Sequence, residues 1–269
     1  MSDFSDFLTD LIELPSLSPS TRNAFDIMDN HDASIREIAE LLEKDPGVVA
    51  RILQVANSAS YGFSAKVKSV TDAMVKIGTG KAKTTILMST LFDGIGNEKL
   101  IEYLRKHSIA VSLTSKFFAR KGGYSKAEDC GSIGLIHDIG QISFILYDVK
   151  VQKKKDVLIP DEYSTKDEIE KYGMSHSAAG ASLLNAWHLP PVFVDTVSHH
   201  HSLEGIPQEI TKPVSAVGLG ELCVNGYLAT RPESDAETAL FMMYLKTLNI
   251  KKDDFMEESA RILDGIDQL

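Results

Sequence analysis

The sequence has few of the residues that mark secreted or membrane-spanning chains. Its 269 residues include two cysteines, Cys130 and Cys223, which are too few for a disulfide framework and lie in apolar segments that suit buried thiols. No apolar run approaches the roughly 18 residues that a bilayer-spanning helix needs. The first ten residues are acidic and lack the basic and apolar regions of a signal peptide. We therefore expect a cytoplasmic protein with no membrane partner.

Positive charge is also scarce. Lys and Arg number 28 against 38 Asp and Glu, which gives a formal net charge of −10 at pH 7. Such a chain repels phosphate backbones, so a nucleic-acid role driven by overall charge is disfavoured, although a local basic patch stays compatible with the composition. The basic residues of segment 150–155 fit a solvated loop. With 43% hydrophobic and 25% charged residues, the chain is an ordinary globular protein and not a disordered one.

Helix signals dominate the rest of the sequence. Residues 34–57 fit two helices, the second of which starts at Asp45-Pro46, where Asp can cap and Pro suits the first helical position. Residues 142–149 favour a helix over a strand because no pairing partner lies nearby, and residues 167–187 fit one helix. Three residue pairs have capping-box spacing: Ser34 with Glu37, Ser69 with Asp72, and Ser125 with Glu128.

The pattern therefore predicts an all-α fold of about a dozen helices, since a mean helix has roughly 11–12 residues. Residues 93–97 (DGIGN) contain two glycines and form a plausible boundary. We expect an N-terminal helical lobe at residues 1–93 and a second helical lobe at residues 94–269.

The histidines carry the chemical signal. Imidazoles and carboxylates fall on five expected helices, in groups 21 to 39 residues apart: His107, His137 with Asp138, His176, His200 with His201, and Glu221. A helical bundle can bring such side chains together, and imidazole with carboxylate is a common ligand set for first-row divalent metals. Each residue also has a simpler interpretation, as a hydrogen-bonded core histidine, a solvated helix end or an ordinary surface acid.

The order of several segments adds a resemblance. GLIHDIGQ (134–141) resembles the His-Asp signature of the HD superfamily of metal-dependent phosphohydrolases, and it is followed by YGMSHSAAGASLLNAWHLP (172–190) and VSHHHS (197–202). Upstream lie KDPGVVARILQVANSASYG (44–62) and SVTDAMVKIG (69–78). Together these segments resemble the HDOD family, the HD-related output domains of bacterial signalling proteins, over residues 14–228. The resemblance implies a multihelical HD-like bundle.

The resemblance also implies roles for particular residues. It assigns His107, His137 and Asp138 to a divalent metal such as iron or manganese, and His176, His200 and His201 to a second metal. Glu221 stands where the superfamily has a late Asp, and its extra methylene displaces the carboxylate. Asp138 and Gln141 are the candidate catalytic residues. Catalytic members often carry Lys at the position of Gln141, so this chain lacks a positive charge that would stabilise a phosphate transition state.

Three functions follow from these observations. The first is a regulatory HDOD domain, non-catalytic or weakly catalytic, whose partners are signalling proteins or a small phosphorylated ligand, with or without a bound metal. The second is a metal-dependent phosphohydrolase acting on a nucleotide or cyclic dinucleotide. The third is a helix-turn-helix DNA binder built on residues 34–57, a segment in which acidic residues outnumber basic ones. Segment 57–62 (NSASYG) fits either a turn or a partner-binding element.

Overall fold

The computed structural model describes residues 3–12, 18–28, 33–57, 66–93, 95–154, 165–226 and 235–266. In these ranges the chain forms fifteen α-helices and one 3₁₀ helix, with no strand, so the predicted all-α class is confirmed. None of the described helices combines the length and the apolar character needed to cross a membrane. The chain divides into two compact units, Thr9–Gly96 and a larger unit of Met1–Leu8 with Asn97–Leu269. The expected lobes at 1–93 and 94–269 stay a prediction about domain organisation.

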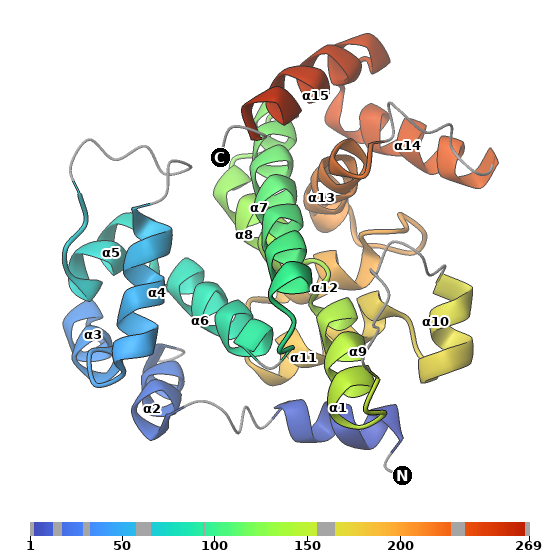
Figure 1. The fold of residues 1–269 in the computed structure, drawn as a ribbon. Coiled ribbons are helices and arrows are strands. Elements are labelled where there is room, and N and C mark those ends of the chain that lie inside the picture. The colour runs from blue at the N-terminus through green and yellow to red at the C-terminus, as the bar shows by residue number, and fades with distance from the viewer. Residues whose placement is uncertain are drawn as a thin grey trace. The chain divides into compact units, whose positions relative to one another are not determined.

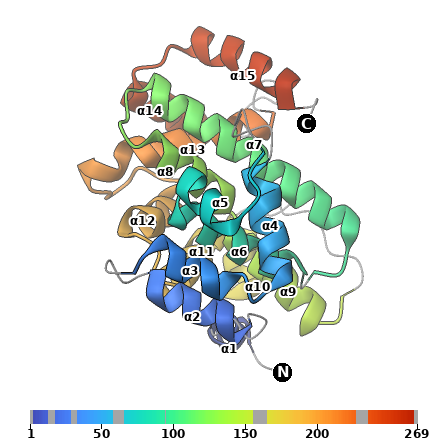
Figure 2. The same cartoon turned by 90° about the vertical axis from the view of Figure 1, so that its left-hand side faces the viewer.

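Short helices build the smaller unit, and Figure 2 shows several of them facing the viewer. Their bounds are α2 (Pro19–Met28), α3 (Ile35–Leu42), α4 (Pro46–Ala56), α5 (Val70–Ile77) and α6 (Thr79–Asp93), while α1 (Phe4–Ile12) starts in the larger unit. Helices α1 and α2 were not predicted from the sequence. Fully buried Leu42, Ile52 and Met74 contribute apolar core from α3, α4 and α5.

The predicted caps of the smaller unit are present. Ser34 and Glu37 form a reciprocal capping box at the start of α3, and the Asp45 side chain accepts from the first backbone N–H groups of α4. Ser69 accepts a hydrogen bond from the backbone N–H of Asp72. These bonds satisfy donors that a helix start leaves unpaired.

Asn57 closes α4. Its side-chain amide donates to the carbonyls of Leu53 and Val67, and its side-chain oxygen accepts from the Val67 N–H. Asn57 therefore ties the end of α4 to the chain that enters α5, as the turn interpretation requires. The rest of segment 57–62 lies outside the described residues.

The larger unit is organised around the long helix α7, which packs against α8 and α13 (Figure 1). Its elements are α7 (Glu98–Lys121), α8 (Ala127–Ile136), α9 (Ile139–Lys150), α10 (Thr165–Tyr172), α11 (His176–Ala186), α12 (Pro191–His199), the 3₁₀ helix Gln208–Ile210, α13 (Thr211–Val224), α14 (Asp235–Leu248) and α15 (Lys252–Ile266). Residues 142–149 lie inside α9, so their helical prediction is confirmed.

Two local predictions in this unit are wrong. Residues 167–187 form two helices, α10 and α11, because the chain turns through Gly173, at φ +81°, and Ser175 then caps α11. The Ser125–Glu128 capping box is absent: Lys126 is the N-cap residue of α8 and provides no side-chain bond. Glu128 instead pairs with Lys116 and Arg120 of α7, so an interhelical ion pair replaces the local cap.

Glycines let the helices of the larger unit approach closely. A Cβ at Gly134 of α8 would lie 2.8 Å from the Val111 carbonyl oxygen of α7. A Cβ at Gly220 of α13 would lie 2.8 Å from the backbone nitrogen of Ser115, also in α7. At Gly140 of α9 a Cβ would lie 1.9 Å from the carbonyl oxygen of His176 in α11. Backbone therefore packs on backbone at three helix contacts.

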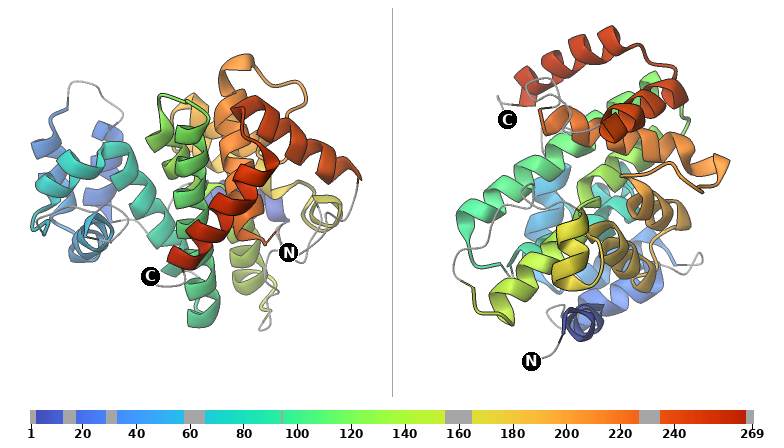
Figure 3. Two further views of the ribbon diagram at one scale, coloured as in Figure 1. Left: turned by 90° about the horizontal axis from the view of Figure 1, so that it is seen from above. Right: turned by 90° about the vertical axis from the view of Figure 1, so that its right-hand side faces the viewer.

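In the larger unit, an apolar cluster lies at the C-terminal end of α7. There the Phe118 and Phe255 rings stack at 5.1 Å, and Phe255 also contacts Phe241. Helix α15 thus covers the end of α7, as the views in Figure 3 show. Tyr244, 1% exposed, donates its hydroxyl proton to the backbone carbonyl of His200 and so links this cluster to the end of α12.

We expect Gly140→Ala to destabilise the protein by about 3 kcal/mol, at the upper end of overpacking effects, because the added methyl group meets backbone that cannot rotate away. Gly80→Ala is the control, since nothing lies within 4 Å of its Cβ. Its change should stay within about 0.5 kcal/mol. Chemical denaturation measures both. Equal stabilities of the two variants would contradict the close α9–α11 packing.

Candidate metal centre

The seven predicted ligand residues lie at helix ends and on inward helix faces of the larger unit. His137 is the C-cap residue of α8 and Asp138 occupies the N-cap position of α9 without a side-chain capping bond, so one short helix–helix junction provides two of them. His176 is the first residue of α11, and His200 follows the last residue of α12. The remaining members are His107 of α7, His201 after α12, and Glu221 of α13. The structure brings all seven into one cluster.

The carboxylate of Asp138 is the centre of the cluster. Its Oδ2 atom lies 3.1 Å from His137 Nε2 and 3.4 Å from His107 Nε2. Its Oδ1 atom lies 3.7 Å from the Nε2 atoms of both His176 and His200. The two oxygens of one carboxylate therefore face two different pairs of imidazoles.

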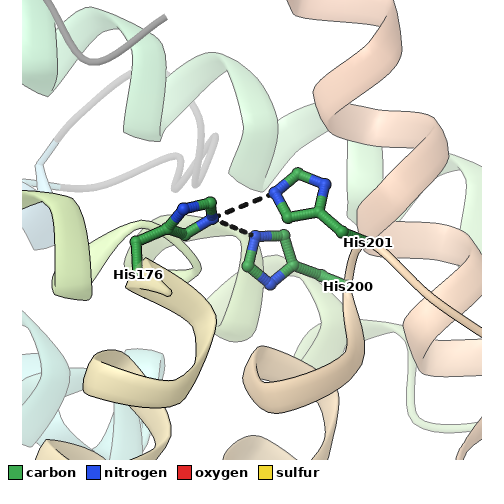
Figure 4. Close-up of side chains that lie close together, drawn as sticks. All are labelled: His176, His200 and His201. Atoms are coloured by element: carbon green, nitrogen blue, oxygen red, sulfur yellow. Dashed lines mark hydrogen bonds between the residues drawn. The ribbon is translucent and has the colours of Figure 1, made fainter. Parts of the chain in front are cut away.

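The second group of imidazoles is compact, as Figure 4 shows. His176 Nε2 lies 3.1 Å from His200 Nε2 and 3.0 Å from His201 Nε2. His201 Nε2 also lies 3.8 Å from Glu221 Oε1. Glu221 is 8% exposed, so the interpretation of this residue as a surface acid is wrong. Its carboxylate joins Asp138 and His200 in a third set of potential ligand atoms within 4.8 Å of one another.

Hydrogen bonds at the Nδ1 atoms, on the side away from the cluster, fix the orientation of three imidazole rings. The Nδ1 atoms of His137 and His200 lie 2.8 and 2.6 Å from the carbonyl oxygens of Gly134 and Val197. His176 Nδ1 lies 2.7 Å from a carboxylate oxygen of Glu168. These oxygens can only accept, so each Nδ1 carries a proton, and the Nε2 atom of a neutral ring points its lone pair into the cluster. Such outer hydrogen bonds are typical of metal-binding histidines.

This arrangement requires positive charge between the rings. With both Nδ1 atoms protonated, neutral His176 and His200 would oppose two nitrogen lone pairs at 3.1 Å. A proton or a metal cation between them removes that repulsion. Asp138 Oδ1 is buried and makes no hydrogen bond in the described structure, so it also offers an unused lone pair. The donor set therefore fits a divalent first-row metal.

The burial of the cluster is uneven. His137 and His200 are fully buried, and Asp138 is 8% exposed, whereas 39% of the His201 side-chain surface is exposed. Of the seven residues, His201 alone is not buried. Access from solvent to the cluster is therefore expected on the His201 side.

The pKa values of two members show how strongly they interact. Burial by itself would raise the pKa of Asp138, but the electrostatic effect of the neighbouring His137, His107 and His200 imidazoles outweighs burial and holds that pKa well below its ordinary value. The pKa of His201 is lowered well below its ordinary value by desolvation and then by the neighbouring His200 and His176 rings, even though part of its side chain reaches solvent. The low pKa of Asp138 keeps its carboxylate ionised at neutral pH.

Gln141 lies one turn after Asp138 on α9 and is 8% exposed. Its side-chain oxygen Oε1 is buried and has no hydrogen-bond partner among the described residues. The Gln141 backbone N–H donates to the Asp138 carbonyl at 2.9 Å, but among the described residues no side-chain hydrogen bond is recorded between Gln141 and the seven cluster members. Gln141 therefore lies close to Asp138 along α9, and its catalytic role stays a prediction.

Sequence reasoning missed Glu168. This residue of α10 is 2% exposed, and its carboxylate accepts a hydrogen bond from His176 Nδ1. An acid eight positions before a histidine is too common a pattern to indicate contact. The erroneous single helix over 167–187 would also have put the two residues on one continuous rod, whereas the turn at Gly173 folds α10 back towards the start of α11.

Comparison with known proteins shows the family of this chain and agrees with its fold. The HDOD domain profile matches residues 14–203, and the chain belongs to the HDOD family. A protein of Treponema pallidum (strain Nichols), itself uncharacterised, is 22% identical over 238 residues, which cover 83% of this chain and 44% of that protein. This chain thus spans less than half the length of that relative.

Solved structures give the same result. An HDOD domain protein of unknown function from Geobacter sulfurreducens is 21% identical, with a TM-score of 0.62 and coverage of 97% of this chain and 95% of that one. A Shewanella amazonensis SB2B protein, provisionally named a metal-dependent phosphohydrolase, is 19% identical, with a TM-score of 0.60 and coverage of 99% and 100%. At these identities the likeness shows a shared fold.

We expect added Co²⁺ or Mn²⁺ to bind at pH 7.5 and to be lost at pH 5, because metal binding requires neutral imidazoles and protons compete with the metal for the Nε2 atoms. Dialysis at each pH followed by elemental analysis measures this. His188→Asn is a matched control: His188 is exposed, stands outside the cluster, and has φ 54°, which Asn tolerates. Retention of the ion at pH 5, or loss of binding in the control, would contradict a histidine-based site.

Proposed function

We propose that this chain is a regulatory HDOD domain that holds divalent metal in the His/Asp cluster. It acts by binding signalling proteins or a small phosphorylated ligand, and hydrolysis is absent or weak. The observation that carries the proposal is the geometry of Asp138, whose two oxygens face separate imidazole sets at 3.1 to 3.7 Å. A carboxylate in this position suits two neighbouring ion positions that share it.

The ligand sets follow from the same distances. The first comprises His107, His137 and Asp138, and the second comprises His176, His200 and His201. Imidazole nitrogen and carboxylate oxygen together suit iron, manganese, zinc or cobalt better than calcium or magnesium, which prefer oxygen alone.

Two features favour regulation over catalysis. The first is position 141, where the Gln141 side chain supplies no positive charge for a phosphate ester, although electrostatic stabilisation is usually the largest catalytic contribution. The second is burial, because six of the seven cluster residues are buried and His201 alone reaches solvent. A centre of this kind suits an ion that organises the fold.

An organising ion would act on the helix ends themselves. The cluster joins α7, the α8–α9 junction, α11, the end of α12 and α13. Bound metal links these elements through non-local contacts, so its presence changes their relative stability. A partner that recognises the exposed surfaces of these helices can thereby sense the loaded state.

We expect Asp138→Ala to weaken divalent-metal binding at least 100-fold, because it removes the carboxylate that both imidazole sets face. Metal at 100 times its Kd should stabilise the unmutated protein by about 2.7 kcal/mol and leave the variant almost unchanged. Titration calorimetry and thermal unfolding with and without Mn²⁺ measure the two effects. Asp195→Ala, on α12 outside the cluster, is the control. Equal Mn²⁺ affinity in unmutated protein and Asp138→Ala would refute the site.

The second candidate is a metal-dependent phosphohydrolase. It is favoured by the same shared carboxylate, since paired metals can hold both the attacking and the leaving oxygen of a phosphoester. The provisional name of the Shewanella structure agrees with this candidate.

An activity assay separates the two candidates. We expect the Mn²⁺- or Fe²⁺-loaded protein to show no turnover of cyclic dinucleotides or a nitrophenyl phosphodiester above the metal-loaded Asp138→Ala background. Gln141→Lys tests whether the missing charge is responsible, and a gain of activity would support that explanation. Turnover by the unmutated protein that Asp138→Ala abolishes would instead establish the hydrolase and overturn the regulatory proposal.

A further inference from the structure

Glu168 makes all of its recorded hydrogen bonds to one residue. Its Oε1 and Oε2 atoms lie 2.7 and 2.9 Å from His176 Nδ1, and Oε2 also accepts from the His176 backbone N–H at 2.9 Å. His176 is the first residue of α11, so this N–H has no partner within its own helix. A carboxylate buried to 2% exposure thus contacts both the ring and the backbone of a proposed ligand.

This support differs from that of the other two oriented histidines. His137 and His200 each bond to a carbonyl three residues earlier in the same chain segment, so local helix geometry alone fixes their rings. His176 depends on a charged group from another helix. A carboxylate also makes the opposite ring nitrogen a stronger donor to a cation than a carbonyl does. The position of α10 therefore bears directly on His176.

Packing on α9 fixes that position. Tyr172 of α10 stacks on Phe144 of α9 with ring centroids 3.9 Å apart and planes at 6°. The Tyr172 hydroxyl and Lys171 Nζ also bond to Asp148 Oδ2 at 3.1 and 3.0 Å. Glu168 and Tyr172 are four residues apart, and side chains at this spacing lie on one face of a helix. The packing of Tyr172 on α9 therefore fixes the position from which the Glu168 side chain contacts His176.

We infer that Glu168 is the positioning residue of the His176, His200 and His201 set. It keeps the proton of His176 on Nδ1 and directs the Nε2 lone pair towards the other two rings, so ion binding at this set depends on Glu168 and on the docking of α10. This inference rests on the ion binding proposed above and assigns a role to a residue outside the ligand sets.

The alternative is a purely structural role, in which Glu168 only stabilises the start of α11. Removal of Glu168 would then lower the stability of the fold without affecting the protonation of the His176 ring. The His176 tautomer in metal-free protein separates the two roles, because it reports the Nδ1 bond and requires no bound ion.

The experiment combines that measurement with Co²⁺ titration. In histidine ¹⁵N-labelled, metal-free protein, we expect His176 to be protonated at Nδ1, and Glu168→Ala to shift it to a mixture with the Nε2-protonated form. Glu168→Gln keeps an acceptor but removes the charge. It should weaken one of two Co²⁺ binding steps by about 10- to 100-fold, the usual effect of losing such a partner, and leave the other step within about threefold.

Two further variants serve as controls, and different results would overturn the inference and the proposed function. Glu170→Gln removes an exposed acid from the same helix and should change neither readout. Tyr172 contacts none of the proposed ligands, so Tyr172→Leu should weaken the same Co²⁺ binding step by a smaller factor than Glu168→Gln. An unchanged Co²⁺ affinity in Tyr172→Leu would contradict the dependence of this step on the docking of α10. An unaltered His176 tautomer in Glu168→Ala, or unaltered Co²⁺ affinities in Glu168→Gln, would overturn the inference itself. Unmutated protein that binds no Co²⁺ would overturn the proposed function, whatever the tautomer shows.

Discussion

The buried charge of Asp138 is the constraint on which the larger unit depends. An ionised carboxylate removed from water is strongly unfavourable unless positive charge or hydrogen-bond donors surround it. Here four imidazoles from α7, α8, α11 and α12 approach its two oxygens. Three of these imidazoles, His137, His176 and His200, already donate their outer Nδ1 protons to carbonyl or carboxylate oxygens, so their Nε2 lone pairs face one another unless a cation or protons lie between them. Charge neutralisation thus links the positions of helices that are far apart in the sequence.

Close backbone packing makes this convergence possible. Gly140 allows the first turn of α9 to meet the first turn of α11, which places Asp138 and His176 beside each other. Gly134 and Gly220 bring α8 and α13 against α7 in the same way. A side chain at any of these positions would separate helix ends that must meet within hydrogen-bonding distance. Close helix packing at the glycines therefore positions the side chains of the cluster, and the imidazoles of the cluster balance the charge of Asp138.

This organisation explains why an ion could serve regulation in such a protein. The proposed ligands come from five helices and have few local contacts in common, so the free energy of ion binding would be distributed over the tertiary structure. Glu168 extends the network to α10, which packs through Tyr172 on Phe144 and, with Phe4 of α1, into an aromatic group. Helix α10 thus connects the surface of the unit to the Nδ1 side of buried His176, a proposed ligand.

Features that arise from contacts between neighbouring residues can be predicted from the sequence. Helical periodicity gave the all-α class, and the caps at Ser34, Asp45 and Ser69 follow from side chains that reach backbone groups two or three positions away. The order of the His and Asp segments also indicated the seven residues that the structure brings together, while their role as ligands stays a prediction. Three features required the folded structure: Glu128 pairs with α7 instead of capping α8, α10 and α11 are separate helices, and Glu168 contacts His176. These outcomes depend on interhelical distances, which backbone packing sets and which no local pattern contains.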